Sequence, residues 1–337
     1  MELGDAAVPA ACPACGGRLA AWRRAPAAEA GDGAGSGSAT GDGDGDGAEA
    51  EAEGPLVALA RCVQCGTGVT LGPVPLDAHE AGDYAPGAPR GARLAAPLLR
   101  AFDRRRLTLL RPAMPPPASL VDAGAGRGRF VGAARAAGYA ASGLEPSARG
   151  VTAAREAYGI GLERTGIETA PIAPGSVDAL SLWHVLEHVE DPGAALGTLR
   201  GWLAPDGVLL VGVPNIASWQ ARLAGPRWYH LDLPRHRTHF TVAGLTTLLG
   251  ASGFCVERTH HVLAEHNPLG MWLACVSRLT RRPSYLYHLL KRNAPLRSPD
   301  LLVTLLALPL LPAAAALELL AGLSRRGGTV AIVARAV

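Results

Sequence analysis

The stretch at residues 120–130, LVDAGAGRGRF, decides the fold class of this chain. An apolar run typical of a buried strand ends at Asp122, and Gly124, Gly126 and Gly128 follow it at alternate positions. Glycines here let the backbone turn tightly and lie against a ligand that any β-carbon would repel. The stretch therefore predicts a strand, a ligand-binding turn and then a helix.

Two familiar nucleotide-binding motifs do not fit this stretch. The dinucleotide fingerprint G-x-G-x-x-G fails because Arg129 stands where the third glycine would be, counted from Gly124. The phosphate-binding P-loop fails because it needs a lysine, and the only lysine of the chain is Lys291. The remaining pattern, D-x-G-x-G-x-G, suits a ligand that lacks a pyrophosphate and carries a cationic amino-acid group.

Strand-like runs alternate with helical runs from residue 119 to about residue 261. The strand-like runs are SLVDAG, YAASGLEP, VDALSLWHV, GVLLVGVPN and FCVERTHHV, and a last one, GTVAIVARAV, lies at 328–337. Such alternation predicts an α/β fold with a doubly wound, Rossmann-like parallel sheet, whose ligand lies at the carboxyl ends of the strands. We assign residues 116–263 plus 328–337 to this domain.

An acidic residue follows the second strand at the distance expected for a nucleoside ligand. Glu145, in GLEP, lies 17 residues after Gly128. In other doubly wound sheets, a carboxylate at this place accepts hydrogen bonds from both ribose hydroxyls. We therefore expect Glu145 to bind the ribose of an adenosyl group, and a solvated loop position is the alternative.

Together these motifs resemble those of class I S-adenosylmethionine-dependent methyltransferases. The resemblance covers about residues 120–254 and includes DAGAGRG, GLEPS, SVDALSLWHVLEHVEDP and LRGWLAPDGVLLVGVPN. It is strongest toward the subgroup of ubiquinone-pathway O-methyltransferases and enzymes encoded with polysaccharide genes. The third strand, GLERTGIE, departs from the family pattern because the usual Asp near the adenine is not evident in it. The resemblance implies S-adenosylmethionine as cofactor and a donor site lined by Asp122, Gly124, Gly126, Gly128, Phe130, Glu145, Pro146, Ile167, Glu168, Trp183 and His184.

Histidines are concentrated after the fourth and fifth strands. His184 and His188 lie in HVLEHV, and His230, His236 and His239 lie in RWYHLDLPRHRTHF. Methyl transfer needs an in-line nucleophile and a place for its proton, so positioning is assisted by a general base. We expect the base among His184, His188, His236 and His239, with His236 or His239 favoured. A structural hydrogen-bonding role is the alternative for each.

The segment HVLEH also matches the inverted zinc-protease pattern H-x-x-E-H. It follows a strand of a methyltransferase-like sheet, so we do not interpret it as a protease motif. His184, Glu187 and His188 could instead share one helical face and bind a divalent cation. Quinone-type relatives are similar but have an acid where His184 stands, and imidazole favours softer metals than magnesium. We favour the alternative, a helix start that packs on the sheet.

Two C-x-x-C pairs, each followed by glycine, occur in CPACGG and RCVQCG. Four thiolates in two such pairs are typical of tetrahedral structural zinc, and many methyltransferases of the subgroup carry a similar N-terminal ribbon. The expected zinc ligands are Cys12, Cys15, Cys62 and Cys65.

The pairs are separated by a segment rich in Ala, Gly, Asp, Glu and Ser, with GDGDGDG at its centre. It cannot bury enough apolar surface to offset its ordering entropy, so we expect a disordered linker at 26–54. Removing it leaves an ordinary ribbon spacing, which predicts a zinc ribbon over residues 1–78. Cys255 and Cys275 are expected to be buried thiols.

Composition excludes a collagen-like, wholly disordered or polytopic membrane protein, since 48% of the 337 residues are hydrophobic and the formal net charge is +3. Basic residues do not cluster in a nucleic-acid reading module, so we expect no nucleic-acid partner. The first ten residues, MELGDAAVPA, lack the basic and apolar regions of a signal peptide. We therefore expect a cytoplasmic location, with membrane association as an option.

Residues 301–323 form an apolar run whose single charge is Glu318, long enough to be a transmembrane candidate. A single crossing is disfavoured because the strand at 328–337 must rejoin the sheet. Pro309 and Pro312 should break the run into two helices. We expect a helical cap over 264–327 that contacts a hydrophobic acceptor, an anionic membrane surface or a second subunit in a homodimer.

Before the glycine turn, apolar residues at helical spacing predict a helical connector over residues 85–115. The sequence as a whole predicts methyl transfer to a small-molecule or lipid-linked acceptor, with oxygen as the expected site of methylation. The alternative is a catalytically silent protein that keeps the donor fold and uses the ribbon and the cap for interactions.

Overall fold

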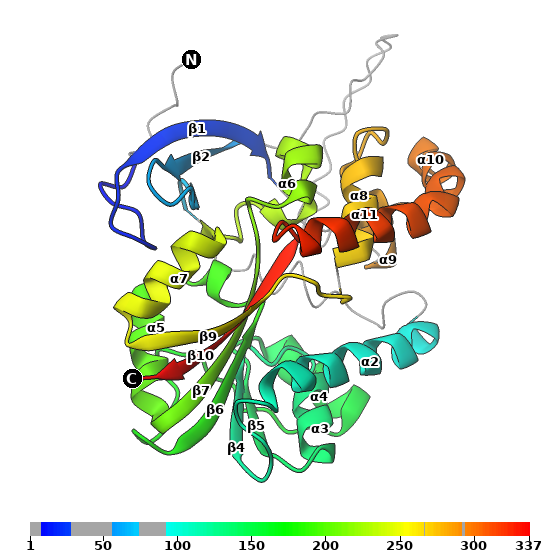
Figure 1. Ribbon diagram of the computed structural model, residues 1–337. Coiled ribbons are helices and arrows are strands. Elements are labelled where there is room, and N and C mark those ends of the chain that lie inside the picture. Colours follow the sequence, from blue (N-terminus) through cyan, green and yellow to red (C-terminus); the bar gives the residue numbers. More distant parts are fainter. Residues whose placement is uncertain (1–7, 28–55, 74–91, 266, 292–293) are drawn as a thin grey trace, which may run out of the picture.

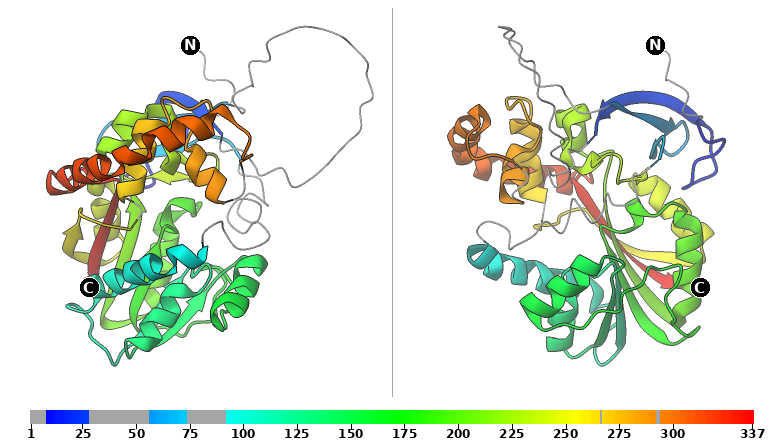
Figure 2. Two further views of the ribbon diagram at one scale, coloured as in Figure 1. Left: turned by 90° about the vertical axis from the view of Figure 1, so that its right-hand side faces the viewer. Right: turned by 180° about the vertical axis from the view of Figure 1, so that it is seen from behind.

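The computed structural model describes residues 8–27, 56–73, 92–265, 267–291 and 294–337. A large sheet is covered by helices on both faces (Figure 1). A small N-terminal sheet and a group of C-terminal helices lie at one end of it, as the views from other sides also show (Figure 2). The linker expected at 26–54 falls almost entirely outside the described residues.

The large sheet has six strands in the order β5-β4-β6-β7-β10-β9. Strands β5, β4, β6 and β7 run parallel, whereas β10 is antiparallel to both of its neighbours. This confirms the doubly wound α/β class and six of the seven expected strands. The strands are β4 (Ser119–Ala123), β5 (Ala140–Leu144), β6 (Val177–Trp183), β7 (Leu203–Pro214), β9 (Phe254–His260) and β10 (Thr329–Ala336).

The expectation that GLERTGIE forms the third strand is wrong, because this segment adds no strand to the sheet. Its contact with the sheet is one isolated bridge between Leu144 and Glu163. Strand β7 lies near the middle of the sheet, and its residues 207–214 are all buried, as expected for a strand covered on both faces.

Helices cover the two faces of the large sheet separately (Figure 1). On one face lie α2 (Ala92–Leu110), α3 (Arg129–Ala136) and α4 (Ala148–Tyr158), and on the other lie α5 (Pro192–Trp202) and α7 (Val242–Ala251). The helix α2 falls within the expected connector.

Local sequence signals account for where several of these helices begin. Asp191 caps α5 by accepting hydrogen bonds from two backbone N–H groups at 2.9 Å, and Pro192 occupies the first turn. Ser147 caps α4 by accepting from the N–H of Gly150 at 3.1 Å. Thr241 caps α7 by accepting from the N–H of Gly244 at 3.0 Å.

The small sheet combines the N-terminal segment with a strand from the methyltransferase-like region. Its order is β1-β2-β3-β8, and β3 pairs with β8 through Gly68–His239 and Val69–Thr238. The N-terminal segment is therefore joined to the loop that carries the histidines. The strands are β1 (Leu19–Pro26), β2 (Leu56–Cys62), β3 (Gly68–Thr70) and β8 (Thr238–His239).

The C-terminal helices precede β10, as the sequence predicts, and we call residues 267–327 the cap. The prolines divide the apolar run, because α10 ends before a 3-10 turn that contains Pro309, and Pro312 lies in the first turn of α11. The helices of the cap are α8 (Asn267–Val276), α9 (Tyr285–Leu290), α10 (Pro299–Ala307) and α11 (Leu311–Leu323), with the 3-10 turn at Leu308–Leu310.

The expectation for two of the cysteines is wrong. Cys255 and Cys275 are exposed. Cys255 lies on β9, the edge strand of the large sheet, where alternate side chains face solvent. Cys275 faces outward from α8, whose neighbouring residues Ala274 and Val276 are buried.

Candidate active site

The glycine turn leaves β4 with three left-handed residues. Gly124, Gly126 and Gly128 have φ values of 74°, 56° and 71°. A β-carbon on Gly124 would lie 2.4 Å from Cγ2 of Val185, and one on Gly128 would lie 3.0 Å from Cγ2 of Ile160. Both the backbone conformation and the close packing therefore require glycine at these two positions.

Glu145 lies at the end of β5 and holds the turn. Its Oε2 accepts a hydrogen bond from the N–H of Gly126 at 2.8 Å, and its Oε1 accepts one from the N–H of Ser147 at 2.9 Å. The side chain is buried. A carboxylate accepts hydrogen bonds from hydroxyl groups as well as from N–H groups.

Asp122 is buried and lies 3.4 Å from Nη2 of Arg106, so it takes part in an ion pair. The same Nη2 donates to Oγ of Ser181 at 2.9 Å. Burial raises the pKa of Asp122 to about 6, and the charge of Arg106 opposes this rise. Arg106 also lies over the rings of Phe130 and Trp183, 3.9 and 4.6 Å from their centroids.

A second ion pair joins α2 to the glycine turn. Nε of Arg129 donates to Oδ2 of buried Asp103 at 2.6 Å, and Nη2 of Arg129 lies 3.8 Å from Glu265. Burial raises the pKa of Asp103, while Arg129 lowers it. Buried charges need such partners because desolvation is expensive. Arg106 and Asp103 are site residues that sequence reasoning missed. The apolar spacing of this helix does not distinguish them from the exposed charged residues beside them.

The residues expected near the adenine lie in different surroundings. Ile167 is buried in the main core, whereas Pro146 and Glu168 are exposed. Trp183, at the end of β6, has a buried Nε1 without a hydrogen-bond partner among the described residues. Their roles toward the donor remain predictions.

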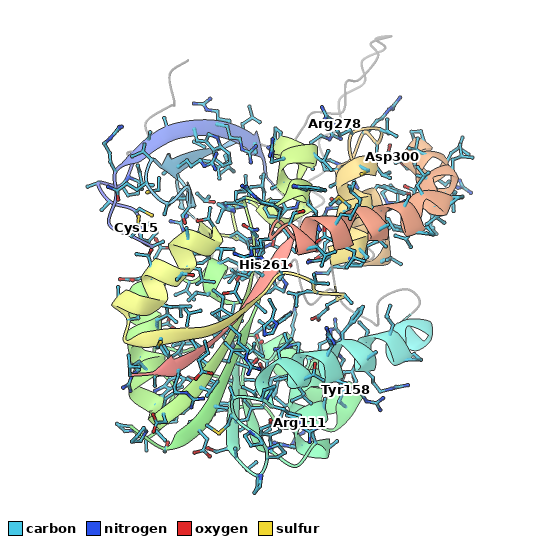
Figure 3. The ribbon with its side chains drawn as sticks, viewed as in Figure 1. Cys15, Arg111, Tyr158, His261, Arg278 and Asp300 are labelled. Carbon is cyan, nitrogen blue, oxygen red and sulfur yellow. The ribbon has the colours of Figure 1, made fainter. Side chains whose placement is uncertain are left out.

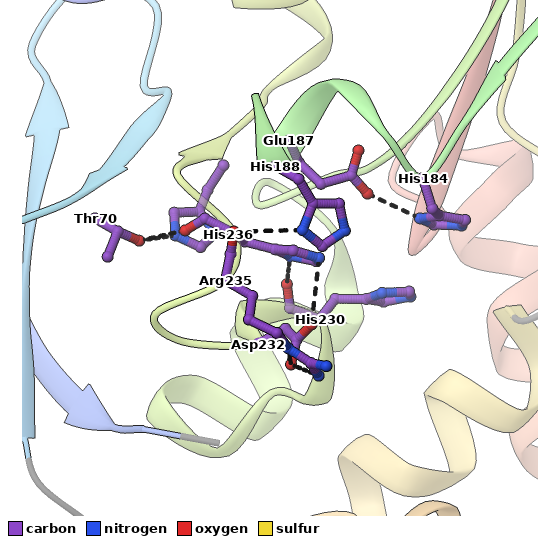
Figure 4. Close-up of polar contacts among 9 residues, drawn as sticks. Thr70, His184, Glu187, His188, His230, Asp232, Arg235 and His236 are labelled. Atoms are coloured by element: carbon purple, nitrogen blue, oxygen red, sulfur yellow. Dashed lines mark hydrogen bonds and ion pairs between the residues drawn. The ribbon is translucent and has the colours of Figure 1, made fainter. Parts of the chain in front are cut away.

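Four of the expected histidines come together after β6 and β7 (Figure 4). Nδ1 of His184 lies 3.0 Å from Oε1 of buried Glu187, and its ring stacks on His230 with 5.4 Å between centroids. The ring of His188 contacts that of His236 edge-on at 4.4 Å. The residue after His184, Val185, is the one that packs against Gly124, so this cluster adjoins the glycine turn.

His236 is buried and its Nδ1 lies 2.8 Å from the carbonyl oxygen of His230. A carbonyl can only accept, so Nδ1 carries the proton. Nε2 lies 3.6 Å from Oδ2 of Asp232. Burial holds the pKa of His236 well below its usual value, and neighbouring His188, His239 and His230 lower it further. The ring is therefore neutral at pH 7.

His239 lies on β8 at the edge of the cluster, with its ring centroid 6.3 Å from that of His236. Thr70 donates its hydroxyl proton to the carbonyl oxygen of His236 at 2.6 Å, so His239 Nε2, 2.9 Å away, must donate to Thr70 Oγ1. Burial lowers the pKa of His239 to about 3, with Arg23 contributing. These contacts give His239 a hydrogen-bonding role within the small sheet, between the N-terminal strand β3 and β8.

Two groups of side chains among the described residues have metal-ligand geometry, each with all ligand atoms within 4.8 Å of one another. The first is Cys12, Cys15, Cys62 and Cys65. Their Sγ atoms lie 3.7 Å apart for Cys12–Cys65 and 3.5 Å apart for Cys15–Cys62. Zn–S bonds of about 2.3 Å imply S–S separations of about 3.8 Å in a tetrahedron. The four thiols therefore fit a structural zinc site.

The second group is Glu187, His188 and His236. His184 is not part of it, although its Nδ1 lies 3.0 Å from Oε1 of Glu187. Two imidazoles and one carboxylate could hold a divalent transition metal more readily than magnesium. The arrangement differs from the helical face considered from sequence, since His236 comes from a different loop.

Residues 92–259 match the family model described as a methyltransferase domain. No curated protein matches the chain.

Solved structures with a similar arrangement include several methyltransferases. An S-adenosylmethionine-dependent methyltransferase from Mesorhizobium loti is 20% identical, with 68% of this chain and 96% of that one covered and a TM-score of 0.43. A 1,6-didemethyltoxoflavin-N1-methyltransferase from Burkholderia thailandensis is 16% identical, with 82% and 97% covered and a TM-score of 0.42. An S-adenosylmethionine-dependent methyltransferase from Thermotoga maritima is 23% identical, with 51% and 76% covered and a TM-score of 0.41.

The family match spans the helix α2, the glycine turn, Glu145 and most of the large sheet. The chain therefore contains a class I S-adenosylmethionine-dependent methyltransferase domain.

Proposed function

We propose that this domain transfers a methyl group to an oxygen of a small-molecule or lipid-linked acceptor, such as a sugar, a quinone-like compound or a natural product. The observation that carries the proposal is the hydrogen bond from the N–H of Gly126 to the carboxylate of Glu145. It holds an acidic side chain against the glycine turn at the carboxyl end of β4.

The residues of the turn fit the methyl donor. The backbone of Gly124, Gly126 and Gly128 would face its amino-acid portion, and Glu145 would accept hydrogen bonds from its ribose. When bound, S-adenosylmethionine supplies a methyl group on a sulfonium, which is electrophilic without further activation. The ion pairs of Arg106 and Arg129 hold α2 against the turn.

His184 is our proposed general base. Its Nδ1 is bonded to Glu187, so Nδ1 carries the proton and Nε2 is basic. This pairing fixes the tautomer and stabilises the imidazolium once formed, as a carboxylate does for a histidine in other enzymes. An acceptor hydroxyl would lose its proton to Nε2 as the new C–O bond forms and the C–S bond of the donor breaks.

Kinetics of His184→Gln and Glu187→Gln test this assignment. We expect kcat to fall by about 10²–10⁴-fold for His184→Gln and the affinity for donor to stay within about twofold. His260→Gln, on β9, is the matched control and should keep its kcat. Unchanged kcat in His184→Gln would reject His184 as the base.

A silent binding protein is the rival function. It predicts donor binding without turnover on any acceptor. Titration with S-adenosylmethionine, followed by transfer of a labelled methyl group to water-soluble and lipid-linked hydroxyl compounds, separates the two.

We also propose that the four cysteines of the N-terminal ribbon bind structural zinc. All four positions of a tetrahedron would be filled by thiolates, so the metal would have no open position for chemistry.

A further inference from the structure

The apolar run of the cap has its polar and apolar sides reversed relative to a helix of a soluble protein. Pro299–Leu323 is the one helical run among the described residues that is long and apolar enough to cross a membrane. Its buried side chains include Asp300, Thr304 and Glu318. Its exposed side chains include nine leucines, at positions 302, 305, 306, 308, 310, 311, 319, 320 and 323.

Water is a poor solvent for such a surface. Leu306, Leu323 and Leu302 are 71%, 67% and 63% exposed. A helix on a soluble protein normally turns leucines toward the core and polar residues toward solvent. Contiguous exposed apolar surface of this kind marks a site of interaction with a protein or a membrane.

Buried hydrogen bonds fix the orientation of the run. The carboxylate of Asp300 accepts from the backbone N–H groups of Arg281 and Arg282 at 2.8 and 2.9 Å, which places it beside the segment after α8 (Figure 3). The carboxylate of Glu318 accepts from Gln220 and from the N–H of Gly328, at 2.9 and 2.8 Å. Turning the leucines inward would leave both carboxylates without these partners, so the leucine face must point outward.

Small residues allow the buried side of Pro299–Leu323 to pack closely against the rest of the protein. Ala307, Ala314 and Ala321 are buried on the same side as the carboxylates. A β-carbon on Gly322 would lie 2.8 Å from the carbonyl oxygen of His261. The run is thus held along the body of the protein at both ends, which does not suit a crossing of the membrane.

The charge around the leucine face is positive. The described parts of the cap contain two acidic residues, Asp300 and Glu318, and both are buried. Exposed arginines precede and follow the run, with Arg297 before it and Arg325 and Arg326 after it. Basic residues beside an exposed apolar face are typical of helices that lie on an anionic bilayer.

We propose that the leucine face of Pro299–Leu323 lies in the interface of a bilayer that contains anionic lipid, with the helical run parallel to the membrane. The cap lies at the carboxyl end of β7, because Thr329, which follows the cap, pairs with Pro214 (Figure 1). The histidine cluster follows β6 and β7 at this same end of the large sheet. Docking in this way would bring that end of the sheet close to the lipid. The proposal does not depend on methyl transfer.

Flotation of the full chain with vesicles tests this proposal. We expect binding to vesicles of phosphatidylcholine with phosphatidylglycerol at low salt, and at least about tenfold weaker binding to phosphatidylcholine alone. Combined Leu302→Gln, Leu306→Gln and Leu323→Gln should weaken binding to the anionic vesicles by at least about tenfold. The matched control is Leu98→Gln, an exposed leucine on α2, which should bind like the parent.

Charge and folding are checked separately. Arg325→Ala with Arg326→Ala should reduce binding to anionic vesicles by at least about tenfold, and salt should have a smaller effect on that variant. Circular dichroism and the melting temperature establish that each variant is folded.

Failure of the parent chain to float with anionic vesicles would overturn the proposal. A dimer in sedimentation that the leucine substitutions abolish, with no vesicle binding, would assign the face to a second copy instead. Titration with S-adenosylmethionine, done in parallel, reports on the proposed function independently.

Discussion

Thr70 of the N-terminal ribbon and His239 of the methyltransferase domain are hydrogen-bonded, with 2.9 Å between Oγ1 and Nε2. Both side chains are buried. The Thr70 hydroxyl also donates to the carbonyl oxygen of His236, next to the histidine cluster. The ribbon therefore supports the loop on which the candidate active site depends.

Replacing Thr70 by Val keeps the shape and removes both hydrogen bonds. A buried N–H on His239 would then lack a partner, so we expect a loss of about 1–3 kcal/mol in the free energy of unfolding. Urea denaturation measures the change. Thr152→Val on α4, where the hydroxyl is exposed, should stay within about 0.5 kcal/mol of the parent. Equal stabilities of the two variants would show that the Thr70 contact is unimportant.

Loss of zinc should loosen the same loop. Cys15→Ser should lower the zinc content below one per chain and speed amide hydrogen exchange at Thr238 and His239, because β8 pairs with the ribbon strand β3. Elemental analysis and hydrogen exchange measure these changes. Cys255→Ser, at an exposed cysteine outside the ribbon, is the control and should retain the metal. A parent protein purified without zinc, or a Cys15→Ser variant that keeps it all, contradicts this account.

Gly124→Ala should disrupt the donor site. The residue has a φ of 74°, and the added β-carbon would lie 2.4 Å from Val185. We expect a loss of about 1–3 kcal/mol in stability and loss of donor binding. Gly197→Ala, in the middle of α5 with nothing within 4 Å of the new carbon, should instead stabilise the protein by about 0.5–1 kcal/mol. Thermal melts and donor titration would compare the pair, and normal donor affinity in Gly124→Ala would argue against the site.

Acid should lower the free energy of unfolding partly through protonation of His239. Burial lowers its pKa to about 3 in the folded protein, so between about pH 6.5 and about pH 3 the unfolded chain binds a proton at this position that the folded chain does not. This residue therefore makes the protein less stable as the pH falls through that window. His239→Asn removes the effect, and its stability relative to the parent should rise by about 1.4 kcal/mol for each pH unit of acidification. Urea denaturation at several pH values measures the difference, and parallel curves for the two proteins would refute it.

The sequence predicts the part of the fold that depends on local pattern. The alternation of apolar runs locates all six strands of the large sheet. The spacing of the glycines and Glu145 predicts a shared donor site, and the structure adds the hydrogen bond between Gly126 and Glu145. The two C-x-x-C pairs likewise meet, because each carries its own turn.

Features that depend on long-range packing are not predictable in this way. The two-residue strand Thr238–His239 is too short to show alternation, and its partner lies far away in the chain. Arg106 ends a run of three arginines, and only the packing of α2 turns this one inward while Arg104 and Arg105 are exposed. For the same reason the sequence gives no sign that His239 would bond to Thr70.

The central claim is that Glu145 and the glycine turn bind S-adenosylmethionine, and that the domain then transfers its methyl group to an acceptor. Titration with S-adenosylmethionine and transfer of its labelled methyl group, measured on the parent chain and on Glu145→Ala, test this most directly. We predict saturable binding and transfer to a hydroxyl acceptor by the parent. Glu145→Ala should bind the donor about 10–100-fold more weakly, because a charged acceptor of hydrogen bonds is lost, while Glu156→Ala at an exposed site on α4 should match the parent. Equal donor affinity in Glu145→Ala and the parent, or donor binding by the parent without transfer to any acceptor, would contradict the account.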